Sequence, residues 1–183
     1  MNDGKIQVYT GEGKGKTTAS IGLIVRALGA GLRVCFIQFD KGSAAEDFYS
    51  ERKILRELKG LDLKVTGKLR MMPNGQFRFN NTPPDFEEAQ KGLKFALEAV
   101  GSGKYDMVVC DEILSCVLTQ LLSEKDVLGL LDEYEKQNRP CELVLTGRSL
   151  SSAISTRVDL VTEMKMVKHY FNQGLKARKG IEF

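Results

Sequence analysis

The chain has 183 residues, and its 27 lysines and arginines nearly balance its 24 aspartates and glutamates, which leaves a net charge of +3. This length predicts one domain, residues 1–183, built around one core. The balance of charges argues against a nucleic-acid partner, because such proteins gather lysine and arginine on one face. We find no apolar signal segment at the amino terminus and no apolar run long enough to span a bilayer, so we expect a cytoplasmic protein with no membrane partner.

Four cysteines stand at positions 35, 110, 116 and 141, and no two of them form a C-x-x-C pair. Two of them lie inside apolar, strand-like runs. This pattern favours buried free thiols in a reducing compartment over a metal site or a redox pair.

The first predicted strand, residues 5–9, leads into a glycine-rich turn, and a helix is predicted over residues 16–31. A strand, a glycine-rich turn, Gly-Lys-Thr and a helix, in that order, form the P-loop arrangement. The backbone amides of such a turn converge on phosphate oxygens, and the helix adds the positive end of its dipole. Lys16 would bring a charge to the phosphates, and Thr17 would offer its hydroxyl to Mg²⁺.

We therefore assign triphosphate binding to eight consecutive residues: Gly11, Glu12, Gly13, Lys14, Gly15, Lys16, Thr17 and Thr18. One position departs from the common pattern, because Thr10 stands where the first glycine is usually found. The alternative is a plain glycine-rich turn between a strand and a helix.

Strands are next predicted over residues 33–39 and 61–66, with a helix over residues 44–58 between them. The following segment, residues 66–84, fits neither pattern, because it is polar, rich in turn residues and carries two phenylalanines. A long irregular loop in a compact domain is usually functional or disordered.

The second half of the chain alternates in the same way. A helix over 84–103 precedes a strand over 105–110, and a helix over 123–137 precedes strands over 141–146 and 159–164. Proline and acids open the first of these helices, and a Ser-x-x-Asp cap opens the second. With the P-loop, this alternation predicts an α/β, P-loop NTPase-like (RecA-like) fold: a mostly parallel sheet with helices on both faces.

Two acids, Asp111 and Glu112, end the apolar strand over 105–110, and the carboxyl ends of parallel strands face the ligand crevice. Asp111 fits a carboxylate that acts on Mg²⁺, and Glu112 could order the metal shell or a reacting group. The alternative is an exposed pair of acids in a turn. Thr146 and Arg148 follow another strand and could reach phosphate or nucleotide, although a surface turn fits them equally well.

With these residues assembled, the chain resembles the P-loop family of ATP:corrinoid adenosyltransferases over nearly its whole length. The resemblance rests on seven blocks in the family's order: TGEGKGKTT, ALGAG after Arg26, FIQFDKG, DMVVCDEI, LVLTGR, DLVTEMKMVKH and GLKARKGIEF. Several blocks in the right order are far more specific than any one motif.

This resemblance implies that MgATP and a corrinoid, cobalamin or cobinamide, bind, and that Co(I) attacks the ribose 5′ carbon while tripolyphosphate leaves. It implies catalytic roles for Lys16, Thr17 and Glu112, and metal binding by Thr17, Asp111 and Glu112. Beyond the P-loop, ATP contacts are assigned to Arg26, Lys41 and Arg148. A flavin-type reductant protein and a homodimer are also implied.

The family's corrinoid-facing segment carries Phe-x-Trp-Glu, and the matching letters here are FRFN, residues 77–80. We expect Phe77 and Phe79 to contact the corrinoid, with Phe79 in place of tryptophan and Asn80 in place of the acid. The alternative is that both rings anchor the loop in the core. Asp40 is a further departure, because it interrupts an otherwise apolar family position just before Lys41.

Two other functions stay open from the sequence alone. A P-loop ATPase or kinase-like enzyme would release phosphate or ADP rather than tripolyphosphate. A nucleotide-dependent corrinoid-binding protein without turnover would bind both ligands and transfer nothing. His169 is expected to secure the C-terminal segment, and the alternative is a cobalt ligand.

Overall fold

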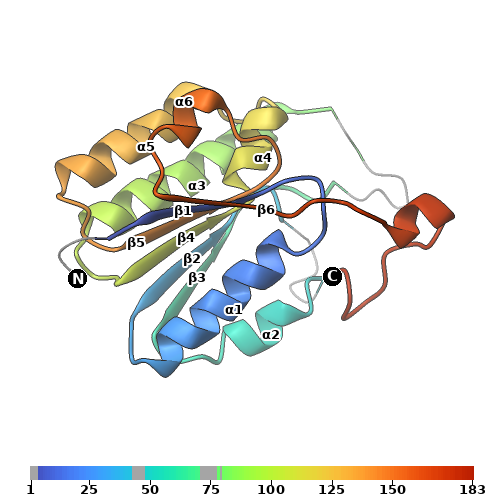
Figure 1. Ribbon diagram of the computed structural model, residues 1–183, viewed down its shortest axis with the longest axis horizontal. Coiled ribbons are helices and arrows are strands. Elements are labelled where there is room, and N and C mark those ends of the chain that lie inside the picture. Colours follow the sequence, from blue (N-terminus) through green and yellow to red (C-terminus); the bar gives the residue numbers. More distant parts are fainter. Residues whose placement is uncertain (1–3, 43–47, 71–77, 79) are drawn as a thin grey trace.

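The computed structural model describes residues 4–42, 48–70, 78 and 80–183 (Figure 1). Its strands are β1 (Ile6–Thr10), β2 (Val34–Gln38), β3 (Leu61–Val65), β4 (Met107–Asp111), β5 (Glu142–Thr146) and β6 (Leu160–Glu163). Its helices are α1 (Lys16–Gly29), α2 (Glu51–Leu55), α3 (Pro83–Gly101), α4 (Ile113–Leu118), α5 (Glu124–Lys136), α6 (Ser152–Ser155) and the 3₁₀ turn η1 (Tyr170–Gln173).

The six strands form one sheet in the order β3-β2-β4-β5-β1-β6, and every pairing is parallel. Gln38 lies beside Asp111, and Tyr9 lies beside Thr146. The carboxyl ends of β1, β2, β4 and β5 therefore meet at one edge of the sheet. This confirms the predicted parallel sheet and shows that β5 separates the P-loop strand from the strand that ends in Asp111.

Helices cover both faces of the sheet, as predicted (Figure 1). Helices α1 and α2 pack on one face, where Ile24 and Leu55 join a buried cluster with Phe36. Helices α3 and α5 pack on the other face, where the cluster includes Leu130. Because both faces are covered, the central strands β2 and β4 are buried at every position and read as apolar runs rather than alternating ones.

The two predicted helix starts in the second half are confirmed by reciprocal capping boxes. Before α3, the Asp85 carboxylate accepts from the amide of Thr82 at 2.7 Å. Before α5, the Asp126 carboxylate accepts from the amide of Ser123 at 2.7 Å, and the serine hydroxyl accepts from the amide of Asp126 at 3.2 Å. Such caps satisfy amides that have no partner within the helix.

The helix predicted over residues 44–58 is wrong for much of its length. In its described part, only Glu51–Leu55 is helical, and residues 48–50 form bends and turns. Within α2 the Arg52 side chain turns inward, where its Nε donates to Gln38 Oε1 at 2.7 Å. The short helices α4 and α6 and the turn η1 were not predicted, since each is too short to show a helical repeat. None of the helices in the described part of the chain combines the length and apolar character that crossing a membrane requires.

Candidate functional site

A cavity of about 750 Å³ opens at the carboxyl edge of the sheet. The P-loop, the β2–α2 connection, the start of α4 and the C-terminal segment form its walls. The lining residues are Glu12, Gly13, Lys14, Gly15, Lys16, Thr17, Thr18, Ile21, Lys41, Tyr49, Ser50, Glu51, Glu112, Arg148, His169, Gly180, Ile181, Glu182 and Phe183. The structure thus brings together most of the residues to which the sequence assigned nucleotide binding.

The P-loop folds around its own lysine. Lys16 is the first residue of α1, and its Nζ donates to the carbonyl oxygens of Gly11 at 2.6 Å and Gly13 at 2.9 Å. A Cβ on Gly13 would lie 2.5 Å from the carbonyl oxygen of Met164, so only glycine fits against the chain that follows β6. Burial lowers the pKa of Lys16, and the nearby Glu112 carboxylate opposes that effect.

The ammonium of Lys41 lies between the Thr17 hydroxyl of the P-loop and the Asp111 carboxylate at the end of β4. Thr17 Oγ1 lies 3.1 Å from both carboxylate oxygens of Asp111. The Lys41 ammonium lies 2.5 Å from Asp111 Oδ2 and 2.9 Å from Thr17 Oγ1. Burial would lower the pKa of Lys41, but the Asp111 and Glu112 carboxylates outweigh it, so that pKa is raised.

This donor set fits a small divalent cation. A hydroxyl and a carboxylate are the oxygen ligands that Mg²⁺ takes, and phosphates and water commonly complete its shell. Among the described residues, no group of three or more histidine, cysteine, aspartate or glutamate side chains could hold a metal by itself. A cation held by Thr17 and Asp111 would therefore need further oxygen ligands from the nucleotide. Lys41 would place a second positive charge beside it.

One hydroxyl orients both acids at the end of β4. Thr146 Oγ1 donates to Asp111 Oδ1 at 2.6 Å and accepts from the amide of Glu112 at 2.9 Å. Glu112 has a φ of 66°, a left-handed conformation that costs free energy for a residue with a side chain and is often found at functional sites. The Ser115 hydroxyl donates to the Glu112 carboxylate, which aims Glu112 along the cavity wall.

Arg148 and Arg26, both assigned to ATP, occupy different places. Arg148 lines the cavity, and its guanidinium pairs with the Glu12 carboxylate of the P-loop. Arg26 lies in the last turn of α1, at the end of that helix away from Lys16, and does not line the cavity. The structure therefore groups Arg148, but not Arg26, with the P-loop.

The C-terminal segment, residues 170–183, reaches back to the P-loop (Figure 1). Lys14 Nζ donates to Glu182 Oε1 and the Ile181 carbonyl, both at 2.8 Å, and to the Tyr170 hydroxyl at 3.0 Å. Phe183 stacks on Phe48 with ring centroids 4.8 Å apart. These contacts cannot be predicted from the sequence, because nothing local in residues 170–183 indicates a partner near residue 14.

The structure also places the four cysteines and His169. All four cysteines are buried and free, as expected, and burial raises the pKa of the Cys35 thiol to about 11. His169 Nδ1 accepts from the amide of Phe171 at 3.1 Å, so it holds the start of η1. Phe77 and Phe79 lie outside the described residues, so their contact with a corrinoid stays a prediction.

Comparison with known proteins gives one family. The model of the ATP:corrinoid adenosyltransferase BtuR/CobO/CobP family matches residues 2–183. A corrinoid adenosyltransferase of Escherichia coli (strain K12) is 33% identical over 180 residues, which cover 98% of this chain and 86% of that protein. One from Sinorhizobium sp. is also 33% identical, over 98% of this chain and 80% of that protein.

Among solved structures, a KaiC-like protein from Pyrococcus horikoshii OT3 is similar with a TM-score of 0.57 and 17% sequence identity. The similarity covers 88% of this chain and 73% of that one, and it confirms the predicted α/β, RecA-like fold. This distant similarity shows the fold alone. The match to the family model also identifies the family, because it spans the P-loop, the Asp-Glu strand end and the C-terminal block together. The chain belongs to the ATP:corrinoid adenosyltransferase family.

Proposed function

We propose that this protein transfers the 5′-deoxyadenosyl group of ATP to Co(I) of a corrinoid, cobalamin or cobinamide, and releases tripolyphosphate. Two observations together carry the proposal. The chain matches the family over residues 2–183, and the three residues assigned to catalysis, Lys16, Thr17 and Glu112, line a single cavity.

In this reaction the electron pair of Co(I) forms the cobalt–carbon bond at the ribose 5′ carbon. The bond from that carbon to the triphosphate oxygen breaks, and the oxygen keeps its electrons. The protein must therefore stabilise negative charge on the departing triphosphate. Lys16 and Lys14 in the P-loop, together with the amides at the start of α1, can supply that stabilisation.

Thr17 and Asp111 would hold Mg²⁺, with Glu112 beside them. When bound, the ion would neutralise part of the triphosphate charge. Lys41 is already in contact with both ligands, so it would add a second positive charge close to the phosphates. Arg148 would contact the nucleotide once its pair with Glu12 opens.

The nucleophile is the corrinoid itself, so the protein has to align and shield it rather than activate water. We assign Phe77 and Phe79 to the corrinoid. We also propose a flavin-type reductant protein as the source of Co(I), a homodimer as the working form, and the cytoplasm as its location. The four free thiols support a reducing compartment.

The test is an anaerobic incubation with MgATP and chemically reduced cob(I)alamin, in which the corrinoid spectrum and the phosphate product are followed. We expect light-sensitive adenosylcobalamin and tripolyphosphate in equal amounts. Lys16→Ala should abolish both products, because the triphosphate loses the positive charge of Lys16. Circular dichroism should show an intact fold.

Other products would support the alternatives. Release of phosphate or ADP without a change in the corrinoid spectrum would indicate an ATPase or kinase-like enzyme. Binding of both ligands without either product, repeated with cob(I)inamide, would indicate a binding protein that lacks turnover. Full activity of Lys16→Ala would show that the phosphates bind elsewhere.

A further inference from the structure

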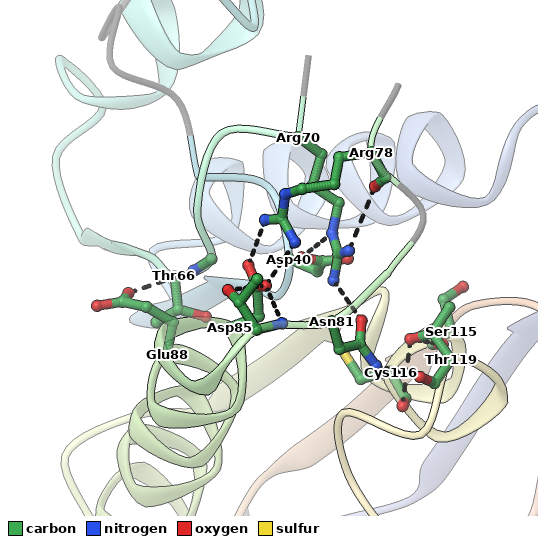
Figure 2. Close-up of polar contacts among 12 residues, drawn as sticks. Asp40, Thr66, Arg70, Arg78, Asn81, Asp85, Glu88, Ser115, Cys116 and Thr119 are labelled. Atoms are coloured by element: carbon green, nitrogen blue, oxygen red, sulfur yellow. Dashed lines mark hydrogen bonds and ion pairs between the residues drawn. The ribbon is translucent and has the colours of Figure 1, made fainter. Parts of the chain in front are cut away.

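Residues 70 and 78 lie on either side of the segment 71–77, and their side chains pair with the carboxylates of Asp40 and Asp85. Figure 2 shows this cluster, which we call the neck: Arg70, Arg78, Asn81 and the acids Asp40 and Asp85. The amide of Arg78 donates to the carbonyl oxygen of Arg70 at 2.8 Å, so the two ends of the segment are tied to each other.

Arg70 is almost fully buried, with 5% of its side chain exposed. Its Nε donates to Asp40 Oδ1 at 2.8 Å, and its second guanidinium nitrogen donates to Asn81 Oδ1 at 3.1 Å. The Asn81 amide group in turn donates to the carbonyl oxygen of Thr119, next to the carboxyl end of α4. A buried guanidinium with these partners is costly to leave unpaired, so this side of the neck has a defined position.

Arg78 forms the other side of the neck. Its guanidinium makes a two-pronged ion pair with the Asp85 carboxylate, at 2.7 Å and 2.8 Å, and that carboxylate is buried at the start of α3. Arg78 stands between Phe77 and Phe79 in the sequence. The two phenylalanines assigned to the corrinoid are therefore neighbours of a residue that is tied to the body of the protein.

Asp40 connects the neck to the nucleotide site. It directly precedes Lys41, whose ammonium contacts Thr17 and Asp111, and its own φ is 48°. The backbone beside Asp40 is closely packed, because a Cβ on Gly67 would lie 2.7 Å from the Cα of Asp40. Residues 40–42 are also joined to the start of the loop by the hydrogen bond from the amide of Lys41 to the Thr66 carbonyl, at 3.0 Å.

We propose that Asp40 is a positioning residue for the corrinoid: through Arg70 it sets the place of the neck relative to Lys41, and so relative to the bound nucleotide. This inference rests on the proposed function and adds a residue to it. Residues 40 and 41 carry a carboxylate that pairs with Arg70 and an ammonium that contacts Thr17 and Asp111, so the positions of both substrates depend on this one segment. Loss of the Asp40 charge should therefore disturb the corrinoid and spare ATP.

The test is Asp40→Asn, which keeps the side chain's size and removes its charge. We expect the KM for cob(I)alamin to rise about tenfold or more, because the ion pair with Arg70 is lost and only a weaker, neutral hydrogen bond can replace it. The Kd for MgATP, measured by equilibrium dialysis, should stay within about twofold of the wild type. Asp40→Glu should restore most of the corrinoid affinity, because it keeps the charge.

Asp62→Asn is the matched control, because it breaks an ion pair with Lys104 (3.1 Å) at the opposite edge of the sheet. It should change neither constant. If Asp40→Asn does not fold, Arg70→Lys, which keeps the charge without the planar fork, takes its place and should show the same selective rise. An unchanged corrinoid KM, or an equal loss of ATP affinity, would overturn the inference. A wild-type protein that makes no adenosylcobalamin would overturn the proposed function instead.

Discussion

At the scale of single residues, Thr146 shows how much of the site depends on one buried hydroxyl. Its hydroxyl donates to Asp111 and accepts from the amide of Glu112, so one group holds two acids. Thr146 is fully buried, and water cannot replace its hydrogen bonds. The orientation of Asp111 toward Thr17 therefore depends on this contact.

Thr146→Val keeps the shape of the side chain and removes the hydroxyl. We expect the free energy of unfolding to fall by about 1–3 kcal/mol, because the buried Asp111 carboxylate and the Glu112 amide each lose a hydrogen bond. The kcat/KM for MgATP should fall about tenfold or more, which corresponds to about 1.4 kcal/mol of lost transition-state stabilisation. Thr156→Val, at an exposed position after α6, is the control, and identical kinetics of both variants would contradict the role of Thr146.

At the scale of elements, the start of α3 is stabilised by more than an ordinary cap. The Asp85 carboxylate accepts from the Thr82 amide at 2.7 Å and from its hydroxyl at 2.6 Å, and it also binds Arg78. The Arg78 guanidinium, followed by the Thr82 donors, holds the pKa of Asp85 well below its ordinary value, against the opposing effect of burial. The Asp85 carboxylate thus both fixes Arg78 at the end of the loop and caps the start of α3.

Asp85→Asn should lower the free energy of unfolding at pH 7 by about 1–3 kcal/mol, since a cap and a charged hydrogen bond are both weakened. Because the folded pKa lies below the unfolded one, the stabilisation by Asp85 is present above pH of about 4 and is lost as the pH falls further. Urea denaturation should show that the difference in the free energy of unfolding between wild type and variant is smaller at pH 3 than at pH 7.

The control for this prediction is Asp126→Asn, in the capping box of α5 at the protein surface. It should cost less stability at pH 7 than Asp85→Asn. A difference between Asp85→Asn and wild type that stays constant from pH 7 to pH 3 would show that the Asp85 charge does not stabilise the fold.

At the scale of the whole molecule, the P-loop and the C-terminal segment, far apart in the sequence, meet at the nucleotide cavity. Lys14 in the P-loop binds Glu182, and Arg178 and Tyr170 bind the same carboxylate. These groups, with Arg178 first and Lys14 next, lower the pKa of Glu182. The last residues therefore form one wall of the site rather than a separate tail.

Glu182→Gln should loosen this wall, because three donors lose their charged acceptor. We expect trypsin to cleave after Arg178 and Lys179 several times faster than in the wild type, as followed by mass spectrometry of intact fragments. Glu98→Gln, which breaks an exposed ion pair with Lys94 on α3, is the control and should leave the cleavage rate unchanged. An equal rate for Glu182→Gln and wild type would show that Glu182 does not hold the segment.

Much of the fold could be predicted from the sequence because its signals are local. Alternating apolar runs predicted the strands, the Ser-x-x-Asp cap predicted the start of α5, and Gly-Lys-Thr predicted the turn before α1. Each of these patterns lies within a few neighbouring residues, whose backbone conformation depends mostly on their own side chains. The helix over 44–58 was predicted too long, because in its described part the residues on both sides of Glu51–Leu55 form bends and turns.

The sequence by itself determined the fold class, the family resemblance and the residues of the P-loop and the Asp-Glu strand end. Only the tertiary structure decided that Lys41 spans Thr17 and Asp111, that Thr146 orients both acids, and that Asp40 holds Arg70. The physical reason is the order of the parallel sheet. It places the ends of distant strands side by side, so contacts between them depend on packing and leave no pattern along the chain.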